Sequence, residues 1–140
     1  MHLRPRLLTL AGVLLVLTGL TSCSGGDTGP FVAYDVDGTY LTEVRIVESN
    51  DPFFDVGEVG TAYLTFVSTG NGVEVASSEG DDVLRMRRER NTLSYVGAIE
   101  GCDSVMRLTW SSPNRFTGSG RDDCYGSVVR YTMKGERTTD

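Results

Sequence analysis

Few residues in this sequence could do chemistry, and the most distinctive is Cys23. The cysteine thiolate is the nucleophilic form, open to acylation or oxidation. Cys23 follows a mostly aliphatic stretch, residues 7–20, with Arg4 and Arg6 before it and small residues after it. This order of basic, apolar and small residues is typical of an export signal. The apolar stretch is shorter than the ~20 residues of a membrane-spanning helix. We therefore expect a targeting segment here.

The tetrapeptide Leu20-Thr21-Ser22-Cys23 resembles the lipobox of bacterial lipoproteins. That resemblance implies a signal peptide at residues 1–22, cleavage before Cys23, a diacylglycerol on the Cys23 thiol and an acyl chain such as palmitate on its amine. Cys23 would then anchor the protein to a bilayer of the cell envelope, outside the cytoplasm. The alternatives are a secretory signal cut elsewhere and an uncleaved anchor.

Removal of residues 1–22 changes the charge balance and the set of possible catalysts. Of 13 basic residues, Arg4 and Arg6 leave with the signal, so 11 face 19 acidic residues and the net charge becomes −8. That charge argues against a nucleic-acid partner, because phosphate contacts need clustered cations. The single histidine, His2, is also removed with the signal. The mature chain then has no histidine for a Ser-His-Asp triad or for a zinc site. We expect no enzymatic activity, no cofactor and no metal.

The other two cysteines, Cys102 and Cys124, form an even pair in an exported chain. Oxidising compartments favour disulfides, so we expect these two to be joined. The alternative is a pair of unbonded buried thiols. The two cysteines lack the Cys-x-x-Cys spacing that would indicate a redox role.

Residues 24–30 are small, polar and Gly-rich, and we expect residues 23–34 to form a lipidated N-terminus followed by a flexible tether. From residue 35 to 140 the pattern is β throughout, with short alternating segments separated by Gly, Asn and Asp. The expected strands are residues 38–47, 61–68, 73–77, 83–87, 92–99, 102–111, 115–120 and 125–134.

Tight turns between these segments predict antiparallel neighbours, and eight such strands can close into a barrel. We expect an all-β meander forming a closed or nearly closed barrel. A two-sheet β-sandwich is the alternative. With these strand boundaries Cys102 and Cys124 lie two strands apart, so their Cα atoms would be about 10 Å from each other. This distance exceeds the ~7 Å Cα separation that a disulfide can span.

The segment Gly38-Thr39-Tyr40 opens the first strand as a Gly-x-Trp motif does in lipocalins, and the longest connection, residues 48–60, follows that strand where lipocalins carry a lid loop. The domain thus resembles a small lipocalin-type barrel. That resemblance implies a small apolar ligand carried in the barrel. Six aromatic residues could line such a cavity or fill it as packed core: Tyr40, Phe66, Tyr95, Trp110, Phe116 and Tyr131.

The connection at residues 48–60 contains adjacent Phe53 and Phe54 in an acidic setting. These residues predict either a lid or partner contact, or a plug that fills the end of the barrel. Arg85, Arg87, Arg88 and Arg90 form a basic run, interpreted as an anionic-partner patch or as a solvated strand face.

Two functions follow from these patterns. One is a non-enzymatic interaction or structural module of the envelope, with an envelope protein as its partner. The other is a carrier of a small apolar ligand.

Overall fold

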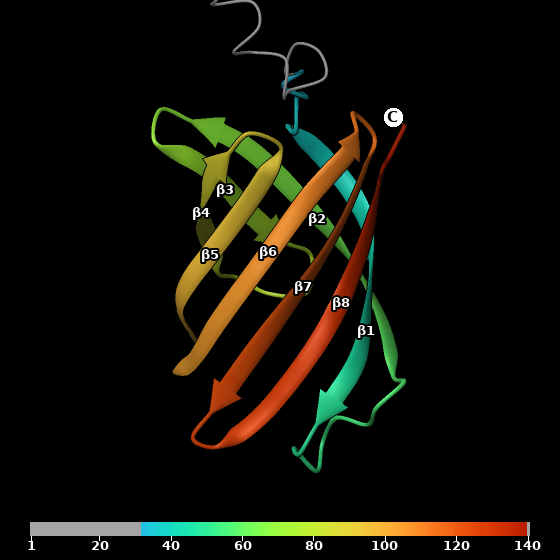
Figure 1. The fold of residues 1–140 in the computed structure, drawn as a ribbon, viewed down its shortest axis with the longest axis vertical. Helices are drawn as coiled ribbons and strands as arrows, with labels where there is room; N and C mark the ends of the chain where they lie inside the picture. The colour runs from blue at the N-terminus through green and yellow to red at the C-terminus, as the bar shows by residue number, and fades with distance from the viewer. Residues whose placement is uncertain (1–31, 140) are drawn as a thin grey trace, which may run out of the picture. The chain divides into compact units, whose positions relative to one another are not determined.

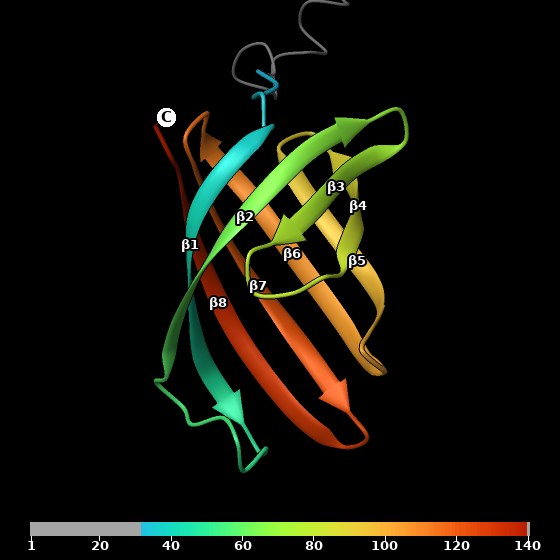
Figure 2. The ribbon, with the colours of Figure 1, turned by 180° about the vertical axis from the view of Figure 1, so that it is seen from behind.

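The structure is a computed structural model and describes residues 32–139, of which residues 33–139 belong to the compact unit Ala33–Asp140. Its eight antiparallel strands close into a barrel in chain order, as Figures 1 and 2 show. The strands are β1 Gly38–Ser49, β2 Val59–Thr69, β3 Gly72–Ser77, β4 Val83–Glu89, β5 Thr92–Ile99, β6 Cys102–Ser112, β7 Arg115–Cys124 and β8 Ser127–Arg137.

The all-β meander is confirmed, and the barrel is closed rather than split into two sheets, because β1 pairs with both β2 and β8. The expected signal peptide, Cys23 and most of the tether lie outside the described residues.

Alternation along each strand builds the interior. Successive strand residues point to opposite faces, and on β8 the residues Val129, Tyr131, Met133 and Gly135 are buried while those between them are exposed. We call the end where β1 begins and β8 ends the closed end. The opposite end, where β1 ends, is the mouth.

Four aromatic rings fill the closed half of the barrel. Tyr40, Phe66, Trp110 and Phe116 are each at most 2% exposed. Their ring centroids lie 4.8–5.8 Å apart, mostly edge to face, an arrangement that aromatic quadrupoles favour. The Trp110 Nε1–H donates a hydrogen bond to the Tyr40 hydroxyl at 3.1 Å. The closed half is therefore solid core.

Interior glycines make room for these rings. A Cβ on Gly135 would overlap the Phe116 ring, and a Cβ on Gly120 would overlap the Tyr131 ring. Small barrels commonly alternate small and large inward residues in this way.

Arg137 fastens the chain that crosses the closed end. Its guanidinium donates to the carbonyls of Asp35, Asp37 and Pro113 and lies 5.0 Å from the centre of the Tyr40 ring. The same segment buries Val36 completely. The polypeptide thus enters the barrel unit at the closed end.

Cys102 and Cys124 form a disulfide, as expected, with their Cα atoms 4.4 Å apart. The separation of two strands expected from the sequence is wrong, because β7 continues past Gly120 to Cys124 and pairs directly with the start of β6. The two Cα atoms have the spacing of a non-hydrogen-bonded antiparallel pair. The disulfide ties β6 to β7 at the mouth.

The weakest seam of the barrel lies between β4 and β5. These strands pair only over Arg87–Glu89 and Thr92–Ser94, near the closed end. Toward the mouth, β4 continues to pair with β3 and β5 with β6. The mouth halves of β4 and β5 therefore diverge from each other.

Candidate functional site

An apolar pocket of about 280 Å³ opens at the mouth of the barrel. Inward residues of six strands, all except β1 and β7, supply its apolar lining, and the turns at the mouth supply its rim. Its residues are Leu64, Val75, Ser77, Glu79, Gly80, Asp82, Leu84, Ile99, Glu100, Met106 and Met133.

The divergence of β4 and β5 explains the position of the pocket. Leu84 on β4 and Ile99 on β5 line it at the level where the two strands no longer pair. A second hollow of about 270 Å³ lies between these strand halves and shares Leu84 and Ile99 with the first. The pocket thus opens both at the mouth and toward the β4–β5 seam.

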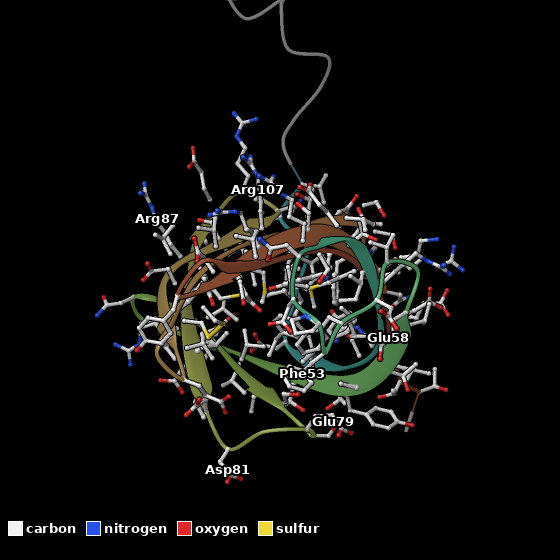
Figure 3. All side chains as sticks on the ribbon, turned by 90° about the horizontal axis from the view of Figure 1, so that it is seen from below. Phe53, Glu58, Glu79, Asp81, Arg87 and Arg107 are labelled. Carbon is white, nitrogen blue, oxygen red and sulfur yellow. A yellow bond between two sulfur atoms is a disulfide. The ribbon has the colours of Figure 1, made fainter. Side chains whose placement is uncertain are left out.

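The rim of the pocket is acidic. Glu79 and Asp82 come from the β3–β4 turn and Glu100 from the β5–β6 turn, and no basic residue is among the residues that line the pocket. Figure 3 views the mouth and labels Glu79 and Asp81 on the β3–β4 turn. Carboxylates concentrated beside a low-dielectric cavity produce a negative potential there. The rim therefore repels anions and attracts cations.

Two buried polar atoms lie on the inner wall beside the pocket. Ser104 Oγ and Asp122 Oδ1 belong to paired residues of β6 and β7, and neither has a hydrogen-bond partner within the described chain. Ser104 is two residues from Met106, which lines the pocket.

Burial, and secondarily the negative charge of Asp122, raises the pKa of the Tyr131 phenol. The Tyr131 phenol therefore ionises less readily than an exposed tyrosine.

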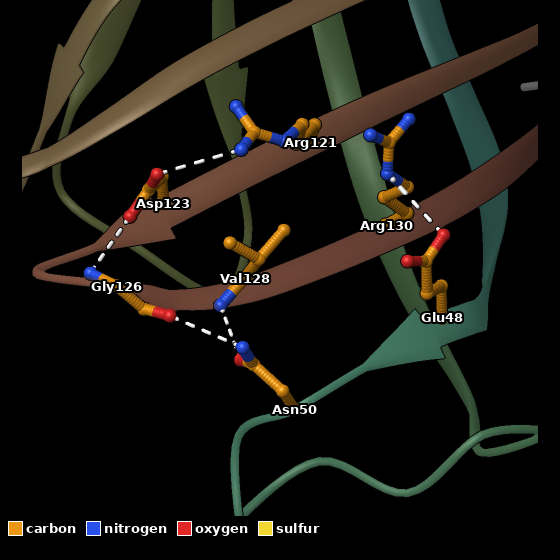
Figure 4. Close-up of polar contacts among 7 residues, drawn as sticks. All are labelled: Glu48, Asn50, Arg121, Asp123, Gly126, Val128 and Arg130. Atoms are coloured by element: carbon orange, nitrogen blue, oxygen red, sulfur yellow. Dashed lines mark hydrogen bonds and ion pairs between the residues drawn. The ribbon is translucent and has the colours of Figure 1, made fainter.

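The predicted loop residues do not fill the barrel. The side chains of Phe53 and Phe54 are 86% and 47% exposed, so the plug interpretation is wrong. Figure 3 shows Phe53 at the mouth end of the molecule. Hydrogen bonds hold the start of the loop against the β7–β8 turn. The Asn50 side chain donates to the Gly126 carbonyl and accepts from the Val128 amide (Figure 4).

The aromatic residues expected to line a cavity mostly do not line this one. Four of them form the core of the closed half, and the pocket walls are aliphatic and methionine side chains. Sequence reasoning missed Leu64, Met106 and Met133 as pocket residues. The alternation along their strands puts them on the inward face, but nothing local indicates which inward residues face empty space.

The basic run does not form one patch. Arg85 pairs with Glu74 at 3.0 Å, and Arg88 donates to the Tyr34 carbonyl at the closed end. Figure 3 shows Arg87 projecting outward. The run is divided between opposite faces of β4, which the alternation of a strand requires.

In the described part of the chain, no three His, Cys, Asp or Glu side chains gather as ligands for a metal ion. Asp37 accepts a hydrogen bond from the Ser68 amide at 2.8 Å. Residues 32–139 contain no helix of the length and apolarity needed to cross a membrane.

No protein-family model matches the sequence, and no curated protein sequence is significantly similar to it. Among solved structures, the chain is similar to one described as EF1p2_mFAP2b bound to DFHBI. The identity is 13% and the TM-score is 0.46, over 74% of this chain and 94% of that one.

Proposed function

We propose that this protein is a non-enzymatic binding protein that holds a small apolar molecule at the mouth of its barrel. The observation that carries the proposal is the apolar pocket in the half that the aromatic core leaves unfilled. Ligand pockets are concave, mostly apolar and largely pre-formed. A ligand that buried itself among Leu64, Met106 and Met133 would gain about 25 cal/mol for each Å² of apolar surface removed from water.

The size and charge of the pocket restrict the ligand. Its volume of about 280 Å³ lies just below the ~300–1,000 Å³ typical of ligand pockets, which favours a compact molecule over a long-chain lipid. The carboxylates of Glu79, Asp82 and Glu100 repel an anionic head group. The expected ligand is neutral or positively charged.

A matched pair of dyes tests this proposal. N-phenyl-1-naphthylamine is neutral and apolar, and 8-anilino-1-naphthalenesulfonate has the same rings with an added sulfonate. We expect the neutral dye to gain fluorescence in a saturable titration of the purified protein. The sulfonate is expected not to displace it, because the acidic rim repels that group.

Neighbouring residues on β6 provide the control. Met106→Trp places an indole in the pocket and is expected to weaken binding of the neutral dye at least ~10-fold. Val105→Trp adds the same group on the outer face and is expected to leave binding unchanged. Equal binding by the two variants, with both folded by circular dichroism, would refute the pocket as the site.

We further propose that acylated Cys23 anchors this binding protein to a bacterial membrane on its extracytoplasmic side. The lipobox sequence supports this, and the described residues that follow the tether lead into the barrel at its closed end, opposite the mouth. Two or three acyl chains give stable attachment, whereas one gives only marginal binding. Cys23→Ala should abolish incorporation of labelled palmitate and release the protein from the membrane fraction. Unchanged mass and membrane retention in that variant would exclude lipidation.

A second candidate function is an interaction module that uses the loop between β1 and β2. The exposure of Phe53, Phe54 and Val56 favours it, because clustered apolar side chains on a surface often mark contact sites. A photo-crosslinking amino acid at Phe53 is expected to capture an envelope protein in cells. The same probe at Val96, which is exposed on the barrel wall, serves as the control. Identical adducts at both positions would argue against the loop.

A further inference from the structure

Three arginines gather on the outer wall of the barrel, on β6, β7 and β8. Arg121 pairs in register with Arg130, and Arg107 lies in the next row, opposite Ser119. Figure 4 shows Arg121 and Arg130 on neighbouring strands, and Figure 3 shows Arg107 projecting from the wall. A shallow groove of about 430 Å³ contains all three, and we call it the arginine groove.

The charges in the arginine groove are only partly neutralised. Like charges directly opposite each other on paired strands are destabilising, and Arg121 faces Arg130 in this way. Asp123 lies 3.4 Å from Arg121 and Glu48 lies 3.3 Å from Arg130. Neither acid lines the groove, and within residues 32–139 Arg107 forms no ion pair.

One guanidinium donor in the groove is buried without an acceptor. Arg121 Nε is shielded from solvent and has no hydrogen-bond partner in the described chain. A buried charged donor that lacks an acceptor costs more than a neutral one. The Arg121 side chain as a whole is 41% exposed, so an oxyanion in the groove can reach the guanidinium beside this unsatisfied donor.

The groove also supplies neutral donors and apolar edges. The hydroxyls of Ser119 and Thr132 lie in the row of Arg107, where they can donate to an anion. Val47 and Val105 border the groove and are 46% and 48% exposed. Arginine is the preferred side chain for oxyanions because its planar fork binds them bidentately.

We propose that the arginine groove binds an oxyanion, with phosphate as the best fit, through Arg107, Arg121 and Arg130. The phosphate can be free or carried by a phospholipid head group. The valine edges suit an amphiphilic carrier of that group. This site is separate from the pocket at the mouth and does not depend on it.

Titration of the purified protein with inorganic phosphate tests the proposal. Nitrogen-15 spectra of the arginine Nε–Hε groups report binding directly. We expect saturable shifts of Arg121 and Arg107, and a rise in melting temperature with phosphate, because a ligand that binds only the folded state stabilises it. Shifts that rise linearly with phosphate, or that affect all arginines equally, would overturn the site.

Glutamine variants separate binding from folding. Arg121→Gln and Arg107→Gln are each expected to weaken phosphate binding ~10-fold or more, and to abolish the phosphate-dependent rise in melting temperature. In phosphate-free buffer both variants should keep the circular dichroism spectrum of the native protein. Arg85→Gln is the control, because Arg85 is an exposed arginine paired with Glu74 on another part of the wall. Equal loss of binding in the control would overturn the proposal.

Vesicles identify the source of the phosphate. Binding to phosphatidylglycerol vesicles that is lost in Arg121→Gln and competed by inorganic phosphate supports a lipid head group. Saturable phosphate binding without vesicle binding supports a free phosphate ligand. Absence of both overturns the site.

Discussion

At the residue scale, burial changes the acidity of two tyrosines in the interior. Burial raises the pKa of Tyr40, and it outweighs the opposing effects of the Trp110 hydrogen bond and of Arg137. Burial also raises the pKa of Tyr131, with a smaller contribution from Asp122. Both phenols therefore stay protonated in the folded protein at a pH where an unfolded chain begins to ionise them.

This difference predicts alkaline destabilisation. Below pH ~10 each phenol is protonated in both states. Above it the unfolded state loses the proton first, so the free energy of unfolding falls by up to ~1.4 kcal/mol per pH unit for each tyrosine. Tyr131→Phe should reduce that slope, measured by urea unfolding at several pH values. Tyr125→Phe is the control, because Tyr125 is 96% exposed. An equal effect of both substitutions would contradict the explanation.

Glycine at position 135 is required by the Phe116 ring. A Cβ there would overlap that ring, and overpacking of a core typically costs ~1–3 kcal/mol. Gly135→Ala should therefore lower the free energy of unfolding by about that amount, measured in denaturant. Gly60→Ala, also in a strand, has no atom within 4 Å of the added Cβ and should change stability little. A tolerated Gly135→Ala would mean that the closed half repacks readily.

At the element scale, the disulfide secures the β6–β7 hairpin at the mouth of the barrel. Cys102 begins β6 and Cys124 ends β7, so the bond joins the two free ends of that hairpin. The two residues are 22 apart in sequence. Closing a loop of this size restricts the unfolded chain.

Loss of this bond should be costly. The chain-entropy estimate for the double variant Cys102→Ala/Cys124→Ala is a loss of roughly 3–4 kcal/mol in the free energy of unfolding. Denaturant unfolding with and without reductant measures it. The wild-type protein should lose similar stability on reduction, and the double variant should be insensitive to reductant. A wild-type protein that is unaffected by full reduction would show that the unfolded state is not restricted in this way.

At the scale of the whole molecule, the barrel has two unlike halves. An eight-stranded barrel is just wide enough either to be filled by side chains or to hold one small ligand. Aromatic rings fill the closed half, whereas shorter aliphatic and methionine side chains leave a pocket in the mouth half. The barrel is thus filled by side chains in its closed half and open to a small ligand in its mouth half.

This division predicts unequal local stability. Amides of β6, β7 and β8 near the closed end are paired on both sides and packed against the aromatic core. Amides of Val83–Met86 and Tyr95–Ile99 that face the β4–β5 seam have no strand partner there. Hydrogen exchange should therefore be slowest in the first group and fastest in the second. Addition of N-phenyl-1-naphthylamine should slow exchange at the mouth, and uniform exchange along all strands would contradict this account.

Most of the fold could be read from the sequence because the alternation of a strand is a local signal. The inward positions of Tyr40, Leu108 and Met133 follow from period-two patterning and tight turns alone. The pairing of Cys102 with Cys124 followed from counting cysteines. The lipobox residues indicate lipidation of Cys23, which stays a prediction.

The features that matter for binding depend on tertiary structure. The pocket exists because β4 and β5 diverge, and no local pattern records where two strands cease to pair. Arg107, Arg121 and Arg130 meet because the register of β6, β7 and β8 makes neighbours of residues that are distant in sequence. Phe53 is 86% exposed although an apolar pocket lies in the mouth half, so the path of the β1–β2 loop decides its position rather than any local pattern. Sequence thus determined which residues face inward, and closure of the barrel decided which of them face empty space.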